Sequence, residues 1–224
     1  MNLFSDPEAV ARYADGPVRQ VPGFHDLHRM AGILLAERMP YDGKVLVLGA
    51  GGGLELKAFA ETQHGWRFCG VDPSAEMLGL AERTLGPLAT RVDLHQGYID
   101  SAPAGPFDGG VCLLTLHFIP EKERRRTLAE MHRRLKPGAP LVVAHHSFPQ
   151  HGAEKAKWLA RYAAFAVAAG MPAENMEKGI SIMSERLPLL SPEQDEAVLR
   201  DAGFTDVALF YAGFTFRGWV ANRK

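Results

Sequence analysis

From Lys44 onward, short apolar runs alternate with longer segments in which apolar residues recur at helical spacing. The apolar runs predict buried strands near residues 44–49, 66–71, 91–95, 108–114 and 140–145. The segments between them predict helices near 53–63, 74–85 and 121–136. This alternation is typical of a doubly wound, mostly parallel α/β sheet with right-handed crossovers.

The chain before the first strand predicts two helices separated by turns. Residues 5–14 favour a short helix, and Asp15-Gly16-Pro17 is expected to break it. A second turn is expected at Val21-Pro22-Gly23, followed by a helix from about His25 to Met39. These residues predict an N-terminal helical cap on the sheet.

Residues 151–189 interrupt the alternation with two helical segments, the first rich in Ala and aromatic residues. We expect them to lie across the mouth of the sheet as a lid, with Trp158, Tyr162 and Phe165 either in the core or facing an acceptor. Ser191 then caps a helix, and Gly213 separates two final strands of an antiparallel hairpin at the sheet edge. The predicted single domain, 1–224, divides into a cap (1–40), a nucleoside-binding core (41–150), a lid (151–189) and a C-terminal helix and hairpin (190–224).

The composition is that of an ordinary globular protein, with 46 % hydrophobic and 23 % charged residues and a net charge of −1. No overall basic field therefore indicates nucleic acid, although a local patch remains open on the arginine-rich segment 121–136. That segment favours a solvated helix face with ion pairs from Glu130 to Arg133 and Arg134. No membrane span or leader is predicted, and Cys69 and Cys112 fall in predicted strands, so we expect a cytoplasmic protein with reduced thiols.

A glycine loop ends the first predicted strand. Gly49, Gly51 and Gly53 alternate with other residues, which lets a ligand approach the backbone closely. Nineteen residues after Gly53, the next strand ends at Asp72, an acid placed to accept hydrogen bonds from ribose hydroxyls. The spacing differs from the dinucleotide fingerprint, because Leu54 stands where a third glycine would be, and no Gly-Lys-Ser/Thr follows. The pattern predicts an adenosine site other than that of a dinucleotide or a Walker-type nucleotide.

Histidines supply the remaining candidate chemistry. His117 follows the fourth predicted strand, where it either deprotonates an acceptor or simply lines the pocket. His145, His146 and His151 invite a metal site, but neighbouring strand residues point to opposite faces. We therefore predict no metal.

Five motifs in order resemble the class I S-adenosylmethionine-dependent methyltransferases. They are Gly49-Ala50-Gly51-Gly52-Gly53, Gly70-Val71-Asp72-Pro73-Ser74, Gln96-Gly97-Tyr98-Ile99, Phe107-Asp108 and Leu135-Lys136-Pro137-Gly138. The resemblance implies S-adenosylmethionine as cofactor. It also implies a Rossmann-like sheet of seven strands with an antiparallel last strand.

A more specific resemblance is to the carboxy-S-adenosylmethionine synthases of tRNA wobble-uridine modification. It rests on Arg19-Gln20-Val21-Pro22-Gly23-Phe24, on Leu114-Thr115-Leu116-His117-Phe118, and on the ending from Ala202-Gly203-Phe204 to Phe216-Arg217-Gly218-Trp219-Val220. It implies a homodimer and a nucleoside site lined by Phe24, Gly49, Ala50, Gly51, Asp72, Pro73, Tyr98, Ile99 and Leu113. Arg19 lies near the mouth of that site, and Gly53 completes its loop.

Three positions depart from what the resemblance implies. The methyltransferases usually have an acid where this chain has Val47, and another where it has Tyr98. The synthases have an arginine for the added carboxylate, and its aligned position here is Ile180. A buried carboxylate without a cation costs several kcal/mol. We therefore expect ordinary methyl transfer, or an activity not yet defined, in preference to carboxy-S-adenosylmethionine synthesis. The near-neutral charge and the helical lid favour a small-molecule acceptor.

Three alternatives remain open at this stage. The first is carboxy-S-adenosylmethionine synthesis, and the second is a non-catalytic nucleoside-binding module. The third is an acceptor other than a small molecule, such as tRNA or a protein. Nothing in the sequence points to a membrane partner.

Overall fold

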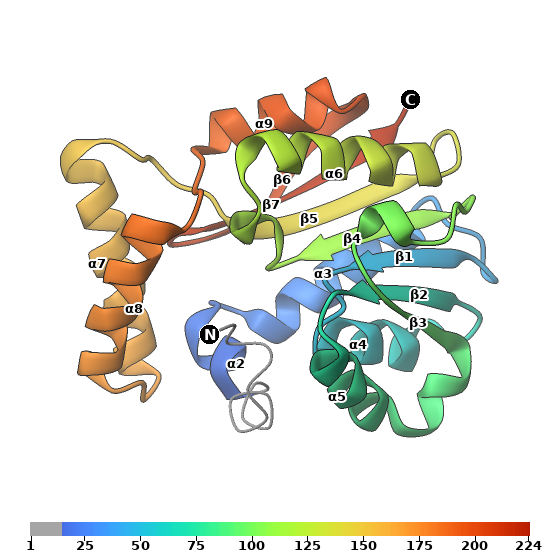
Figure 1. The fold of residues 1–224 in the computed structure, drawn as a ribbon, viewed down its shortest axis with the longest axis horizontal. Coiled ribbons are helices and arrows are strands. Elements are labelled where there is room, and N and C mark those ends of the chain that lie inside the picture. Colours follow the sequence, from blue (N-terminus) through green and yellow to red (C-terminus); the bar gives the residue numbers. More distant parts are fainter. Residues whose placement is uncertain (1–14) are drawn as a thin grey trace.

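The computed structural model describes residues 15–224, and the helix predicted for 5–14 lies outside the described residues (Figure 1). A sheet of seven strands in the order β3-β2-β1-β4-β5-β7-β6 forms the centre. The strands are β1 (Lys44–Leu48), β2 (Arg67–Asp72), β3 (Val92–Gln96), β4 (Gly109–Leu113), β5 (Pro140–His146), β6 (Phe204–Gly213) and β7 (Phe216–Arg223). Strands β1 to β5 are parallel, and β7 runs antiparallel to both β5 and β6. The predicted doubly wound sheet, its antiparallel last strand and its terminal hairpin are confirmed.

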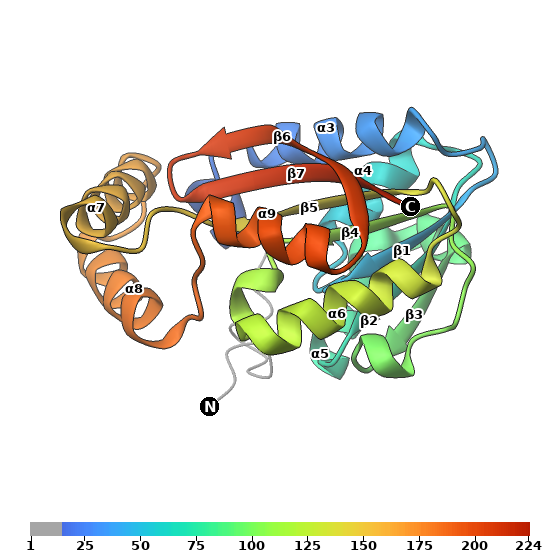
Figure 2. The same cartoon turned by 90° about the horizontal axis from the view of Figure 1, so that it is seen from above.

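Helices cover both faces of the sheet (Figure 2). One face carries α3 (Phe24–Ala36), α4 (Leu54–Thr62) and α5 (Ala75–Leu85), and the other carries α6 (Glu121–Arg134) and α9 (Pro192–Asp201). Alternate residues of β1 enter the two cores: Val45 and Val47 pack toward α3 and α4, while Leu46 and Leu48 pack toward α6. The buried β1 pattern therefore reflects a layer of helices on each side.

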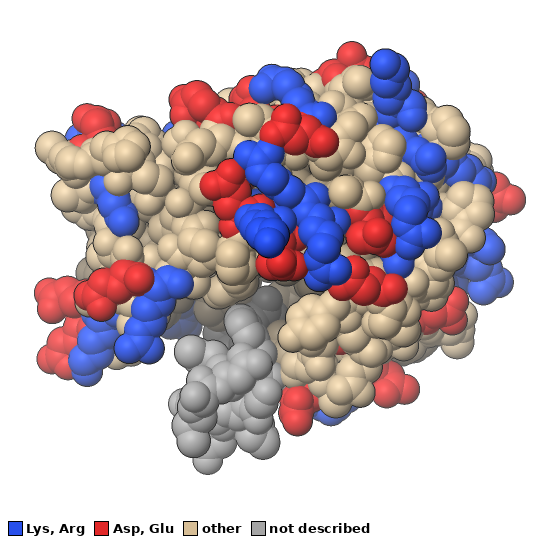
Figure 3. Space-filling view, turned by 45° about the horizontal axis from the view of Figure 1, so that its top comes forward, with Lys and Arg blue, Asp and Glu red and all other residues tan. Residues whose placement is uncertain are grey.

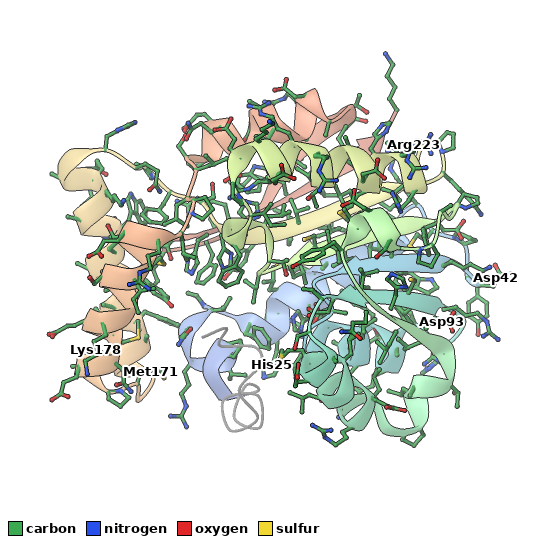
Figure 4. All side chains as sticks on the ribbon, in the orientation of Figure 1. His25, Asp42, Asp93, Met171, Lys178 and Arg223 are labelled. Atoms are coloured by element: carbon green, nitrogen blue, oxygen red, sulfur yellow. The ribbon has the colours of Figure 1, made fainter. Side chains whose placement is uncertain are left out.

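The segment predicted as a lid forms the helix pair α7 (Gly152–Ala168) and α8 (Ala173–Arg186). Met171 and Lys178 mark this pair at one end of the molecule, whereas Asp42 and Arg223 mark the other end, where β1 begins (Figure 4). The pair thus lies beyond the carboxyl ends of the parallel strands. Tyr162 of α7 is buried and its hydroxyl lies 3.4 Å from Gln20 Oε1.

Three expectations about local structure are corrected or sharpened. The predicted break at 15–17 is wrong, because α2 (Asp15–Gln20) is helical there, and Pro17 is tolerated in its first turn, where its missing N–H costs no bond. The face of α6 is only partly solvated, since Arg124 and Arg134 are buried. The predicted ion pairs of Glu130 with Arg133 and Arg134 are present. Over the described surface in Figure 3, acidic and basic side chains are interspersed.

The buried arginine Arg124 joins α6 to α9. Its Nη1 lies 2.5 Å from Asp195 Oδ1, and its Nη2 donates to the Pro188 carbonyl. Burial raises the pKa of Asp195, but His145 and Arg124 beside it bring that pKa below its ordinary value. The negative charge of Asp195 is therefore compensated inside the protein, and its pair with Arg124 joins the two helices.

Both cysteines are free and buried, as predicted. None of the helices in residues 15–224 combines the length and the apolar character needed to cross a bilayer.

Candidate functional site

A cavity of about 780 Å³ opens at the carboxyl ends of β1, β2 and β4. The sheet order reverses between β1 and β4, which is where open α/β sheets place their ligands. Its lining comes from α2, the loops after these strands, α6, β5 and β7: Gly16, Pro17, Gln20, Val21, Leu48, Gly49, Gly51, Asp72, Pro73, Ser74, Met77, Gly97, Tyr98, Ile99, Asp100, Leu114, Thr115, His117, Phe118, Ile119, Pro120, Glu123, Arg126, Thr127, His146 and Phe216.

Two glycines of the loop are required by the backbone itself. Gly49 has φ +77°, and a Cβ placed there would lie 2.0 Å from Thr115 Oγ1. Gly53 has φ +79°, and its Cβ would lie 2.9 Å from Ala81 Cα, so this glycine lets α4 approach α5. Gly49 therefore belongs to the wall of the cavity, whereas Gly53 acts in helix packing behind it.

Asp72 fixes the shape of the glycine loop. Its Oδ2 accepts from the Gly51 backbone N–H at 3.0 Å and its Oδ1 from the Ser74 N–H at 2.9 Å. Burial raises the pKa of Asp72, while these two hydrogen bonds lower it. Ser74 takes the capping role on α5, because its Oγ accepts from Met77 N–H. Each carboxylate oxygen keeps a second lone pair, which is available to a ligand hydroxyl in the cavity.

The residues after β3 form the far lip of the cavity. Tyr98 is 70 % exposed, and Ile99, the first residue of the short helix η3 (Ile99–Ser101), is buried. Asp100 follows on the lip and pairs with Arg126 of α6. Tyr98 and Ile99 therefore add an aromatic ring and an aliphatic side chain to the cavity that Asp72 also lines.

His117 lies in η4 (Leu116–Phe118), just after β4, and lines the cavity as predicted. Burial, with His146 and His145 nearby, holds the pKa of His117 well below its ordinary value, so the ring is neutral. Its Nδ1 accepts from the His146 backbone N–H at 3.5 Å, and a neutral ring bonded in this way carries its proton on Nε2. In this tautomer His117 is a hydrogen-bond donor rather than a base.

His145 and His146 point to opposite faces of β5, as expected for neighbouring strand residues. His145 Nε2 lies 3.1 Å from Asp195 Oδ1, whereas His146 Nδ1 lies 2.9 Å from Thr215 Oγ1 and its ring stacks on Phe216 at 3.9 Å. Burial lowers the pKa of His146 to about 3. No cluster of three potential metal ligands is found in residues 15–224.

A second, small cavity of about 30 Å³ lies behind Gly49. It is lined by Phe24, His28, Gly49, Leu54, Glu55, Leu113, Leu114 and Thr115. Gly49, Leu114 and Thr115 belong to the linings of both cavities, so the two are neighbours. Leu114 has φ 57°, a left-handed conformation that non-glycine residues rarely adopt outside functional sites.

The predicted donor-site residues fall into three groups. Six line the large cavity, two line only the small one, and three line neither. The respective lists are Gly49, Gly51, Asp72, Pro73, Tyr98 and Ile99; Phe24 and Leu113; Arg19, Ala50 and Gly53. Ala50 is fully buried and Arg19 is exposed on the last turn of α2.

Sequence reasoning missed several wall residues. Thr115, His146 and Phe216 reach the cavity only because β4, β5 and β7 are neighbours in the sheet. Glu55 was also missed, although its sequence carries a signal. It is an acidic residue beside Leu56, on the buried side of a helix that opens at the glycine loop.

The comparisons with known proteins agree with this fold. A family model described as a methyltransferase domain matches residues 45–138, which span the glycine loop, Asp72 and His117. This methyltransferase domain and the order of the strands are those of an S-adenosylmethionine-dependent methyltransferase.

A near-full-length relative is the carboxy-S-adenosyl-L-methionine synthase of Chromohalobacter salexigens, 27 % identical over 98 % of this chain and 83 % of that protein. Two solved structures share the fold. An O-methyltransferase family protein from Burkholderia thailandensis has a TM-score of 0.73 at 18 % identity, with 99 % of this chain and 61 % of that chain covered. Human N-acetylserotonin methyltransferase, in complex with S-adenosylmethionine, has a TM-score of 0.63 at 14 % identity, with 97 % and 56 % covered. The chain therefore spans less than two thirds of these two proteins.

The residues at the cavity fit S-adenosylmethionine. Asp72 presents oxygens with free lone pairs at the strand end, and Gly49 and Gly51 leave the backbone accessible. Tyr98 and Ile99 line the same cavity as that carboxylate. The volume lies in the upper part of the range for small-molecule sites, which leaves space for a second ligand beside the cofactor.

Proposed function

We propose that this methyltransferase transfers the methyl group of S-adenosylmethionine to a small-molecule acceptor. Asp72 holds the ribose, Tyr98 and Ile99 flank the adenine, and the acceptor occupies the half of the cavity near His117, His146 and Phe216. The cavity volume and the mixed polarity of its walls support two ligands of small-molecule size.

The observation that carries this proposal is the charge of the cavity wall. Arg126 is the one Lys or Arg among the described lining residues, and it already pairs with Asp100 and Glu123. Ile180 of α8 is a partly buried apolar residue that packs against the core. A cofactor with an additional carboxylate would therefore find no free cation along this wall, and an unpaired buried charge is costly.

S-adenosylmethionine supplies a methyl group that its sulfonium makes electrophilic. The chain's own task is then to exclude water and to align a nucleophilic atom at about 3–3.5 Å from the reacting carbon. Phe118 and Phe216 provide apolar surface for this alignment. His117, neutral and protonated on Nε2, donates a hydrogen bond that orients the acceptor. A strong base is not required of it, because the methyl group is already activated.

The first experiment identifies the ligand that the purified protein retains, by native and denaturing mass spectrometry. The expected mass is that of S-adenosylmethionine or its demethylated product. Recovery of the carboxylated cofactor would overturn the proposal. Incubation with methyl-labelled cofactor and fractionated small-molecule, RNA and protein pools then identifies the acceptor; label in the RNA or protein pool would refute a small-molecule acceptor.

A second candidate function is carboxy-S-adenosylmethionine synthesis, which the near-full-length similarity to such synthases favours. It would move the ring carboxyl group of prephenate, as CO2, onto the methyl carbon of the cofactor. That carbon loses a proton, the ring loses hydroxide, and phenylpyruvate and water are released. Production of the carboxylated cofactor from S-adenosylmethionine and prephenate would establish it. In that event Ile180→Arg should raise its rate, because the arginine implied by the resemblance would be restored.

A further inference from the structure

Glu55 is a buried carboxylate on the first turn of α4, with 8 % of its surface exposed. The influences on its pKa are burial, its own backbone N–H and the negative charge of Asp72. No ion pair links it to a Lys, Arg or His within residues 15–224. An ionised carboxylate buried without a cation is costly, so Glu55 ionises only when a cation from outside binds beside it.

The small cavity beside Glu55 has the size of one polar group. Its volume of about 30 Å³ exceeds the roughly 10–15 Å³ that one water molecule needs in a cavity, so one small polar group fits there. An ammonium group has nearly the same size as a water molecule. Its walls include Gly49 and the hydroxyl-bearing Thr115, so Glu55 is not the only polar residue in the lining.

The other basic group on this wall cannot serve as the partner. Burial and the neighbouring His25 lower the pKa of His28 to about 4, so its imidazole is neutral at pH 7. Cys112 of β4 is also near Glu55, and burial raises the pKa of its thiol well above the ordinary value. Asp72 of β2 adds a second negative charge. Glu55 is therefore surrounded by neutral and anionic groups.

The hydrogen bonds of the glycine loop also favour a cation over an anion at this site. The N–H groups of Gly49 and Ala50 both donate to the Val71 carbonyl, and that of Gly51 donates to Asp72. With these donors engaged, the loop offers carbonyl oxygens and little to an anion. On β1, where the resemblance led us to expect an acid, Val47 is fully buried in the core.

We propose that Glu55 and the small cavity behind Gly49 bind the α-ammonium group of the S-adenosylmethionine amino-acid end. The carboxylate thus comes from α4 in this chain, in place of β1. This inference rests on the proposed function only insofar as the protein binds S-adenosylmethionine; it does not depend on which acceptor is methylated.

The test compares two ligands that differ in the amino-acid end. S-adenosylhomocysteine carries the ammonium group, and 5′-methylthioadenosine lacks the whole amino-acid end. Isothermal titration is performed with the wild type, with Glu55→Gln, and with Glu61→Gln, an exposed glutamate on the same helix. A charge-assisted hydrogen bond corresponds to about 10- to 100-fold in affinity. We expect Glu55→Gln to lose this factor for S-adenosylhomocysteine and to bind 5′-methylthioadenosine unchanged, and Glu61→Gln to behave as the wild type.

Proton release provides a second readout. Burial raises the pKa of Glu55 to about 8, so its carboxyl is largely protonated at pH 7. Pairing with an ammonium group lowers that pKa, and titrations in two buffers of different ionisation enthalpy should show nearly one proton released per S-adenosylhomocysteine bound at pH 7. Asp72, His28 and Cys112 remain in Glu55→Gln, so the release should disappear only if it comes from Glu55.

Each outcome has one meaning. Equal weakening of both ligands by Glu55→Gln would show a general distortion of the site and overturn the proposal. Unchanged affinity for S-adenosylhomocysteine would overturn it as well. Failure of the wild type to bind either ligand would instead refute the proposed function.

Discussion

Replacing Glu55 with glutamine is expected to change how the stability of the protein depends on pH. The pKa of the native carboxyl is raised from 4.5 to about 8, mainly by burial. The native state therefore binds more protons than the unfolded state between these two values. Stability falls as pH rises through this window, since unfolding releases the carboxyl to ionise in water. The amide introduced by Glu55→Gln would have the same shape but no ionisable group, so this position would no longer contribute to the pH dependence.

The magnitude follows from proton linkage. Each pH unit between the two pKa values changes the free energy of unfolding by about 1.36 kcal/mol. From pH 5 to pH 7.5 the wild type should therefore lose about 3 kcal/mol relative to Glu55→Gln. The histidines and the other carboxylates are common to both proteins and cancel in the difference.

The assay is urea unfolding at pH 5, 6, 7 and 7.5 for both proteins, with the free energies extrapolated to water. A constant offset between them would reflect packing of the amide, so the measured quantity is the change of their difference with pH. A difference that stays constant over this range would refute the raised pKa. A difference of opposite sign would mean that Glu55 has a stabilising cation partner.

The remaining predictions concern other parts of the site and fold. Saturating S-adenosylhomocysteine should stabilise the wild type by about 2.7 kcal/mol at a hundred times its Kd, measured as a shift in Tm. Asp72→Ala should abolish most of this shift, whereas Asp42→Ala, at the far end of the sheet, should keep it. Asp100 is not a suitable control, because it lines the cavity. Gly49→Ala should destabilise the protein more than Gly138→Ala, since both have φ near +78° but only Gly49 would meet Thr115; equal effects in thermal unfolding would refute the clash. Below pH 6.5 the wild type should lose stability, because the pKa of His146 is lowered to about 3 and the unfolded chain takes up the proton first. In urea titrations, His146→Phe should make this loss shallower by about 1.4 kcal/mol per pH unit. An unchanged slope would contradict the neutral buried ring. Arg124→Ala should cost about 3–5 kcal/mol by removing the buried arginine that pairs with Asp195, whereas the Tm of Arg133→Ala should match the wild type. Similar small effects would show that the buried pair adds nothing.

Local patterns determined much of the fold. Apolar runs gave the positions of β1, β2, β4 and β5 to within a few residues, because a strand covered on both faces has to be apolar. The sequence also predicted a ligand site at the loop from Gly49 to Gly53 and at Asp72, for a related reason. A close backbone approach to a ligand excludes side chains, and a carboxylate at the end of a strand can accept hydrogen bonds from the loop and from a ligand. The N-terminal region was harder to predict. Pro17 suits both a turn and the first turn of a helix, and the sequence alone favoured a turn where the structure has a helix.

The tertiary structure decided which polar residues meet. Arg124 and Arg133 are both arginines on α6, yet only Arg124 faces α9 and is buried, because burial depends on which helix lies alongside. His146 and Phe216 reach the cavity because β7 inserts beside β5, a pairing that no local pattern specifies. Glu55 looked like an ordinary helical glutamate. Its raised pKa and its cavity arise only when α4 packs behind the glycine loop, since desolvation is a property of the surroundings and not of the residue.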